Sequence, residues 1–137
     1  MYINEAKITV RYVETDKMGI VHHSHYYAWF EVGRTDFIKY CGMGYGDMEA
    51  AKVMMPLIES HCKYIEGAKY EDEITIKTSI ESMNGAKVIF NYSAIRDFDK
   101  KILAKGCTVH AFVNEQFKII NIKKKRPEIW EKLQMLL

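Results

Sequence analysis

YVETDKMGIVHHSHYYAWFEVGRTDFIKYC, residues 12–41, is the most informative stretch of this chain. It leaves a strand, turns through Asp16 and Gly19, passes a group of histidines and enters a helix. Ser24 is the predicted N-cap, and the pattern ends near Cys41. One face of this helix forms a wide, mostly aromatic stripe. Its members are Tyr26, Trp29, Phe30, Gly33, Phe37 and Tyr40. A stripe of this width indicates that the helix covers an apolar surface.

Gly33 lies inside the stripe, where it costs about 1 kcal/mol of helix stability relative to alanine. The expected reason for a glycine there is a close approach between the helix backbone and a sheet. The rest of the chain is therefore expected to supply that sheet.

Alternating side chains predict the strands. Residues 5–12 form the first, with Ala6, Ile8, Val10 and Tyr12 on its inward face. The remaining strands are expected at 57–65, 74–81, 88–94 and 102–113, with a short one at 117–122. Asn84-Gly85 indicates a two-residue hairpin, residues 45–52 a short helical turn or loop, and Pro127 the start of a short amphipathic helix. One strand, a long helix and then a run of strands indicate an α+β fold, a curved antiparallel sheet wrapped around one long central helix.

Length and composition narrow the class of protein. The 137 residues are expected to form a single domain, 1–137. A net charge of +2 does not favour nucleic-acid binding, and neither a signal peptide nor a membrane-spanning segment is expected. The cysteines, Cys41, Cys62 and Cys107, are odd in number and lack metal-binding spacing. Buried free thiols in a reducing cytoplasm are the simplest interpretation.

Asp16 is the first candidate for chemistry. It follows a strand end, precedes a glycine turn and lies at the mouth of the predicted sheet–helix layer. A carboxylate in that place could attack a carbonyl carbon or activate water. The alternative is an ordinary turn-forming residue.

The histidines His22, His23 and His25 allow several interpretations. His22 and His25 could bind a metal ion with Asp16, although a zinc site normally has a clearer ligand set. One histidine could instead position a substrate, or all could be polar residues that open a helix. The first turn of a helix exposes free N–H groups, which would form an oxyanion hole for a thioester carbonyl.

Tyr12 is expected to be a core tyrosine with its hydroxyl at the edge of the site. His61 and His110 lie within predicted strands and are interpreted as structural. The basic run Lys123–Arg126 is expected to be a solvated turn, with phosphate contact as the alternative.

A longer pattern spans Tyr12–Arg34 and reads Y-x-E-T-D-x-x-G-I-V-x-H-x-x-Y-x-x-x-F-E-x-x-R. It resembles the 4-hydroxybenzoyl-CoA thioesterase family of hotdog-fold acyl-CoA thioesterases, and most closely the bacterial branch associated with the Tol–Pal system. The segments Tyr64–Asp72 and Gly106–Asn114 resemble later parts of the same family.

The resemblance implies a hotdog subunit that dimerises into a continuous sheet, with dimers often paired into tetramers. It implies hydrolysis of an acyl-CoA to a carboxylic acid and free CoA, without a metal or other cofactor. Asp16 matches the catalytic aspartate, which acts as nucleophile or general base. His23 matches the position whose backbone N–H polarises the thioester carbonyl, and Tyr12 matches a tyrosine near the aspartate.

Two departures from the family pattern leave the acyl group open. Gly67 stands where the family commonly has a proline, and Ser24 and His25 replace the pair of a small residue and Asn or Ser often found before the position of Tyr26. Two other functions remain as alternatives, an acyl-thioester hydratase or dehydratase and a non-catalytic acyl-CoA-binding protein. The absence of a G-x-S-x-G elbow argues against a serine nucleophile.

Overall fold

The computed structural model describes residues 1–137 and contains one five-stranded antiparallel sheet. The strands are β1 (Asn4–Thr9), β2 (Leu57–Tyr64), β3 (Glu73–Met83), β4 (Lys87–Arg96) and β5 (Lys101–Ala111). Their order across the sheet is β1-β3-β4-β5-β2, so the first two strands in the chain form the two edges. Alternation explains the central strands, because every second residue of β4, from Val88 to Arg96, is buried.

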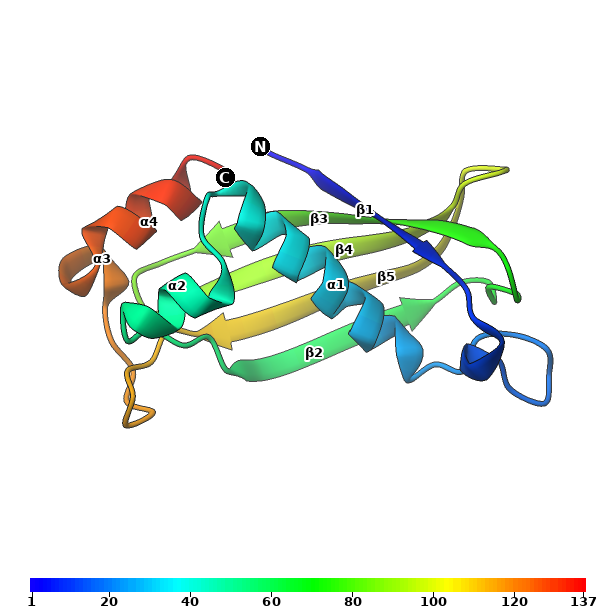
Figure 1. The fold of residues 1–137 in the computed structure, drawn as a ribbon, viewed down its shortest axis with the longest axis horizontal. Helices are drawn as coiled ribbons and strands as arrows, with labels where there is room; N and C mark the ends of the chain where they lie inside the picture. The colour runs from blue at the N-terminus through cyan, green and yellow to red at the C-terminus, as the bar shows by residue number, and fades with distance from the viewer.

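The long helix α1 (His25–Tyr40) crosses one face of the curved sheet (Figure 1). The shorter helices are α2 (Tyr45–Ala50), α3 (Ile122–Lys125) and α4 (Pro127–Gln134), which lie toward the C-terminal end of α1. This arrangement confirms the predicted α+β fold. No helix is both long enough and apolar enough to cross a bilayer.

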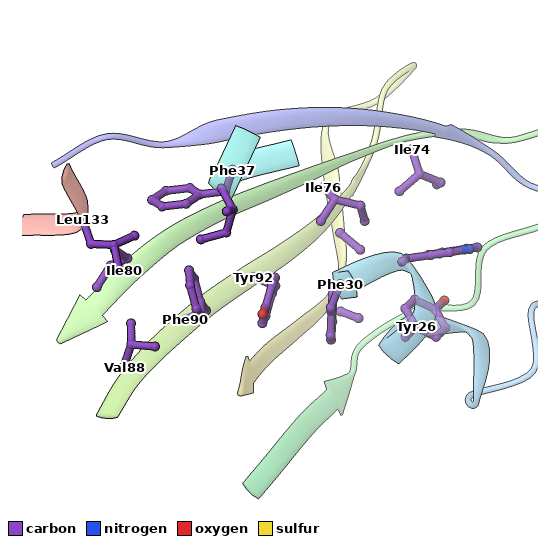
Figure 2. Packing of buried hydrophobic residues seen from close by; sticks show 14 of the residues in the cluster. Tyr26, Phe30, Phe37, Ile74, Ile76, Ile80, Val88, Phe90, Tyr92 and Leu133 are labelled. Carbon is purple, nitrogen blue, oxygen red and sulfur yellow. The ribbon is translucent and has the colours of Figure 1, made fainter. Parts of the chain in front are cut away.

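The aromatic stripe of α1 forms the centre of the core (Figure 2). Phe30 stacks on Tyr92 of β4 with a ring-centroid distance of 4.6 Å. Phe37 meets Phe90 edge-on at 5.7 Å. The prediction that Tyr40 is the last residue of the buried stripe is wrong, because Tyr40 is 62% exposed, whereas Ile38 is buried. The stripe is therefore rotated slightly at the C-terminal end of the helix.

Glycines allow the helix and the sheet to approach closely, as predicted for Gly33. A Cβ atom at Gly33 would lie 2.5 Å from Thr78 Oγ1 and 2.8 Å from Ile76 Cγ2. On the side of the sheet, a Cβ atom at Gly106 of β5 would collide with the ring of Phe30 of α1. Helix and sheet thus meet at two positions where no side chain fits.

Three predicted boundaries are wrong for local reasons. The first strand ends at Thr9 rather than at residue 12, and Tyr12–Glu14 forms a 3₁₀ turn, η1. Residues 117–122 form no strand beyond an isolated bridge between Val113 and Ile119. The hairpin loop has three residues, Asn84–Ala86, instead of two. Asn84 Oδ1 holds it by accepting hydrogen bonds from the N–H groups of Ala86 and Lys87.

Candidate active site

The loop that carries Asp16 lies at the N-terminal end of α1 (Figure 1). Asp16 N–H donates to Ile20 O at 2.8 Å, and Gly19 N–H donates to Asp16 O at 2.9 Å. Gly19 has φ = +81°, which favours glycine. Asp16 Oδ1 accepts a hydrogen bond from Met18 N at 2.9 Å. Only one carboxylate oxygen is used to hold the turn, so the half-buried Asp16 keeps Oδ2 available for another partner.

The entrance to α1 exposes one backbone donor. His22 N–H donates to Glu14 O at 2.9 Å, and His25 N–H donates to His22 O at 3.0 Å. Ser24 occupies the N-cap position, but its hydroxyl pairs with His22 Nδ1 at 2.8 Å instead of capping the helix. His23 N–H, between these groups, donates to no acceptor in the chain. His23 as a residue is exposed, so an oxygen atom of a bound molecule could accept from this unpaired N–H.

The histidine side chains gather at the same end of the helix. The rings of His22 and His23 lie 4.2 Å apart, and those of His22 and His25 lie 6.4 Å apart. His22 and His23 are exposed, and His25 is half-buried. No group of three His, Cys, Asp or Glu side chains is arranged to hold a metal ion.

The predicted inward orientation of Tyr12 is wrong. Its side chain is 75% exposed and meets Tyr70 edge-on, with a ring-centroid distance of 5.6 Å. The alternation of β1 stops at Thr9, and the 3₁₀ turn that follows carries Tyr12 outward. Tyr12 therefore lies on the surface of the loop that carries Asp16, outside the core.

Two residues to which the sequence analysis assigned no role contact the site. Tyr64, at the end of β2, donates from its hydroxyl to His23 O at 3.4 Å. Although the Tyr64 side chain is 45% exposed, partial desolvation is the largest cause that raises its pKa to about 12, so the phenol is protonated at neutral pH. Glu14 is only 2% exposed and accepts a hydrogen bond from Trp29 Nε1 at 2.9 Å. Neither contact has a sequence signal, because each joins residues from different elements.

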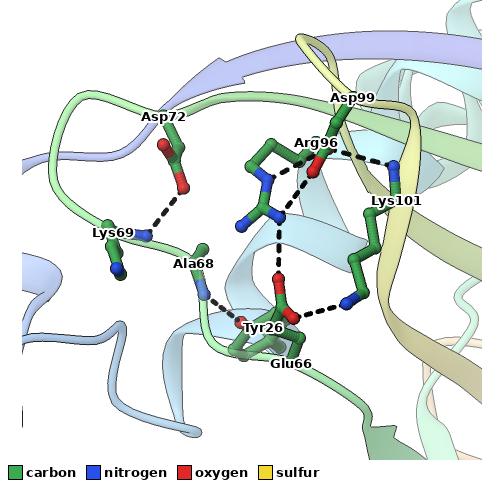
Figure 3. Close-up of polar contacts among 8 residues, drawn as sticks. All are labelled: Tyr26, Glu66, Ala68, Lys69, Asp72, Arg96, Asp99 and Lys101. Carbon is green, nitrogen blue, oxygen red and sulfur yellow. Dashed lines mark hydrogen bonds and ion pairs between the residues drawn. The ribbon is translucent and has the colours of Figure 1, made fainter.

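A second loop, residues 65–72, supports the site from the sheet side (Figure 3). Val21 N–H donates to Ala68 O at 2.9 Å, and Ala68 N–H donates to Tyr26 OH at 3.4 Å. A Cβ atom at Gly67 would lie 2.6 Å from Ile20 Cγ2. The space that a proline ring would need at Gly67 is thus filled by the Asp16 loop.

Ion pairs hold this second loop against the β4–β5 hairpin. Arg96 of β4 pairs with Glu66 and with Asp99, each at 2.7 Å, and Lys101 pairs with Glu66 at 2.5 Å. Figure 3 shows Glu66 between the two cations. The loop is therefore tied to the sheet on one side and to the Asp16 loop on the other.

Solved structures place this fold in a known class. A DHNA-CoA thioesterase from Staphylococcus aureus superposes with a TM-score of 0.90 at 29% identity, covering 99% of this chain and 93% of that one. The fold is that of the hotdog thioesterases, as the resemblance implied.

Sequence comparison gives the family. The model of the Thioesterase-like superfamily matches residues 10–134. YneP of Bacillus subtilis strain 168, whose name assigns it acyl-CoA thioesterase activity provisionally, is 37% identical over 129 residues, with 93% of each chain covered. A protein of Aquifex aeolicus named provisionally as an esterase is 30% identical over 120 residues, covering 88% of this chain and 91% of its own. The chain belongs to the Thioesterase-like superfamily and is a thioester hydrolase.

Proposed function

We propose that this enzyme hydrolyses an acyl-CoA to a carboxylic acid and free CoA, with Asp16 as nucleophile or general base and His23 N–H as oxyanion donor. One observation carries the proposal: a carboxylate with a free oxygen lies in a loop bonded to a helix entrance that exposes an unpaired N–H. A thioester carbonyl needs both groups, because attack at the carbon places negative charge on the oxygen. Tyr12, exposed on the same loop, is proposed to contact the substrate at the mouth of the site.

Both roles of Asp16 give a balanced reaction. As a general base, Asp16 takes a proton from water while the water oxygen bonds to the carbonyl carbon. The C–S bond then breaks, and the CoA thiolate leaves and takes up a proton. As a nucleophile, Asp16 Oδ2 bonds to the same carbon and displaces the thiolate, and water then cleaves the mixed anhydride. In either case the oxyanion faces His23 N–H.

Asp16→Asn is the test. The amide oxygen still accepts the bond from Met18 N, so the loop is expected to keep its shape. An amide cannot accept the proton or attack, so the rate of thiol release should fall at least ~100-fold. The assay follows thiol release from short aliphatic, long aliphatic and aromatic acyl-CoAs, with thermal unfolding measured on the same samples. Asp36→Asn, an exposed aspartate on α1, is the matched control and should keep full activity.

Other outcomes would point to the alternatives. Unchanged thiol release in Asp16→Asn would refute the assignment of Asp16. Loss of the conjugated enone from an enoyl thioester without thiol release would indicate a hydratase. Tight acyl-CoA binding by the wild type without turnover would indicate a binding protein.

We further propose a homodimer joined through strand β2, with pairing of dimers into a tetramer, in the cytoplasm. The support for a dimer is the free edge of β2, which carries exposed apolar side chains. The support for a reducing compartment is that Cys41, Cys62 and Cys107 are all free thiols.

A further inference from the structure

We infer that Glu14 is a positioning residue, a buried carboxylate that holds Asp16 and His23 N–H in their relative places. The inference rests on the proposed function, because it names the residue that builds that same site. Glu14 itself is only 2% exposed and bonds to groups of the protein, so it is not assigned contact with the substrate.

The Glu14 carboxylate is fully engaged inside the protein. Oε1 accepts a hydrogen bond from Arg11 N at 2.8 Å, and Oε2 accepts one from Trp29 Nε1 at 2.9 Å. Arg11 Nη2 lies 3.5 Å from Oε2. Burial alone would raise the pKa of Glu14, but the bonds from Arg11 and Trp29 outweigh it and lower the pKa below its ordinary value. The group is therefore ionised at neutral pH and accepts from both donors.

The backbone of Glu14 reaches the other half of the site. Its carbonyl oxygen accepts from His22 N at 2.9 Å, immediately before the exposed N–H of His23. The next residue, Thr15, bridges to Val21 across the loop, and Asp16 follows. The side chain of Glu14 fixes this loop to the first turns of α1 through Trp29, which is only 3% exposed. One residue thus ties the carboxylate and the oxyanion donor to the same rigid helix.

Stability alone does not account for a charge in this place. Burying a carboxylate is costly, and an apolar residue of similar size often stabilises such a site as well or better. Catalysis, in contrast, depends strongly on geometry, and a displacement of ~1 Å can lower a rate about 100-fold. The pattern of contacts fits a residue that fixes geometry.

The test uses Glu14→Gln in the full-length enzyme. The glutamine amide presents one oxygen and one NH₂ group to two donors, so one of the bonds from Arg11 and Trp29 is lost. We expect kcat for acyl-CoA hydrolysis to fall at least 10-fold while KM changes less than 3-fold, measured below the unfolding temperature. A variant that only loses stability would keep the kcat of its folded fraction. Glu131→Gln, an exposed glutamate on α4, is the matched control.

If Glu14→Gln does not fold, Glu14→Asp tests the positioning role of Glu14 instead. It keeps the charge but withdraws the carboxylate by one methylene group, so a smaller loss of kcat with unchanged KM is expected. Wild-type kcat in either folded variant would overturn the inference. That result is distinguishable from failure of the proposed function, which would appear as a wild type without thiol release or an active Asp16→Asn variant.

Discussion

At the scale of single residues, His110 is a buried histidine at the end of β5 that the proposed mechanism does not use. It is 2% exposed, with Nδ1 3.0 Å from Met55 O and Nε2 2.9 Å from Thr108 Oγ1. Burial is the main cause that lowers the pKa of His110 to about 4, and the nearby charge of Arg34 acts in the same direction. The imidazole is therefore neutral in the folded protein at physiological pH.

This pKa predicts acid sensitivity with a definite sign. In the unfolded chain a histidine has a pKa of about 6.5, so between about pH 6.5 and pH 4 the unfolded state binds one more proton than the folded state. As the pH is lowered from 6.5 to 4, the free energy of unfolding should fall by about 1.4 kcal/mol per pH unit, roughly 3 kcal/mol in all. Urea denaturation at a series of pH values measures it.

His110→Gln is the matching variant. It removes the titrating group but can still hydrogen-bond, so it should be less stable than the wild type at pH 7 and lose less stability between pH 6.5 and 4. An unchanged pH dependence in this variant would contradict the assignment to His110. His61, on the exposed face of β2, serves as the control through His61→Gln.

The sequence predicted single residues unevenly. Asp16 could be selected because turn chemistry is local, whereas His23 was singled out from the other histidines only by the resemblance to the thioesterase family. The structure brings both to one end of α1. Glu14 could not be singled out, since its partner Trp29 is distant in sequence and becomes a neighbour only when the loop folds back on the helix. Tyr12 was misplaced because its alternation continues past the last strand residue.

At the scale of elements, α1 could be predicted from its sequence. The helical spacing of its aromatic residues indicates that it covers an apolar surface, and Gly33 indicates a close approach to that surface. The five main strands were also predictable, since their alternation is local. The order β1-β3-β4-β5-β2 was not, because it depends on long-range pairing. Residues 117–122 alternate only briefly, and Asn121 caps α3 by accepting from Lys123 N at 3.0 Å. Local capping outweighs strand propensity there.

Gly33 and Gly46 give a matched test of helix–sheet packing. Alanine in a helix is favoured over glycine by about 1 kcal/mol. At Gly46, in the first turn of α2, a Cβ atom would meet nothing within 4 Å, so Gly46→Ala should stabilise the protein by up to about that amount. At Gly33 the Cβ atom would press on Thr78 and Ile76, and overpacking costs typically 1–3 kcal/mol, so Gly33→Ala should be neutral to destabilising by about 2 kcal/mol.

Thermal and urea unfolding of both variants measure the difference. Equal gains in stability would show that α1 can move away from the sheet at Gly33 without cost. The two substitutions are chemically identical, so the contrast between them isolates the contact with the sheet.

At the scale of the whole molecule, the unpaired edge of β2 is the feature that the single chain leaves exposed. Only one side of β2 is paired, with β5, whereas its other side has no neighbouring strand. Leu57 and Ile58 are each 55% exposed, and Tyr64 is 45% exposed. Free edges with apolar side chains invite pairing with another strand. Joining two β2 edges would continue the sheet across two subunits and cover these side chains.

Ile58→Lys tests the proposed dimer. A lysine on an edge strand is a common way in which proteins block edge pairing, because its charge would be buried in the joined sheet. The wild type should elute as a dimer or tetramer in size-exclusion chromatography with light scattering. Ile58→Lys should shift toward monomer with a dissociation constant raised at least 10-fold, about 1.4 kcal/mol.

Ile119→Lys is the control. It changes a side chain that is 69% exposed and lies outside the sheet, and it should leave the mass unchanged. A monomeric wild type at micromolar concentration, or an Ile58→Lys variant of wild-type mass, would exclude β2 as the interface.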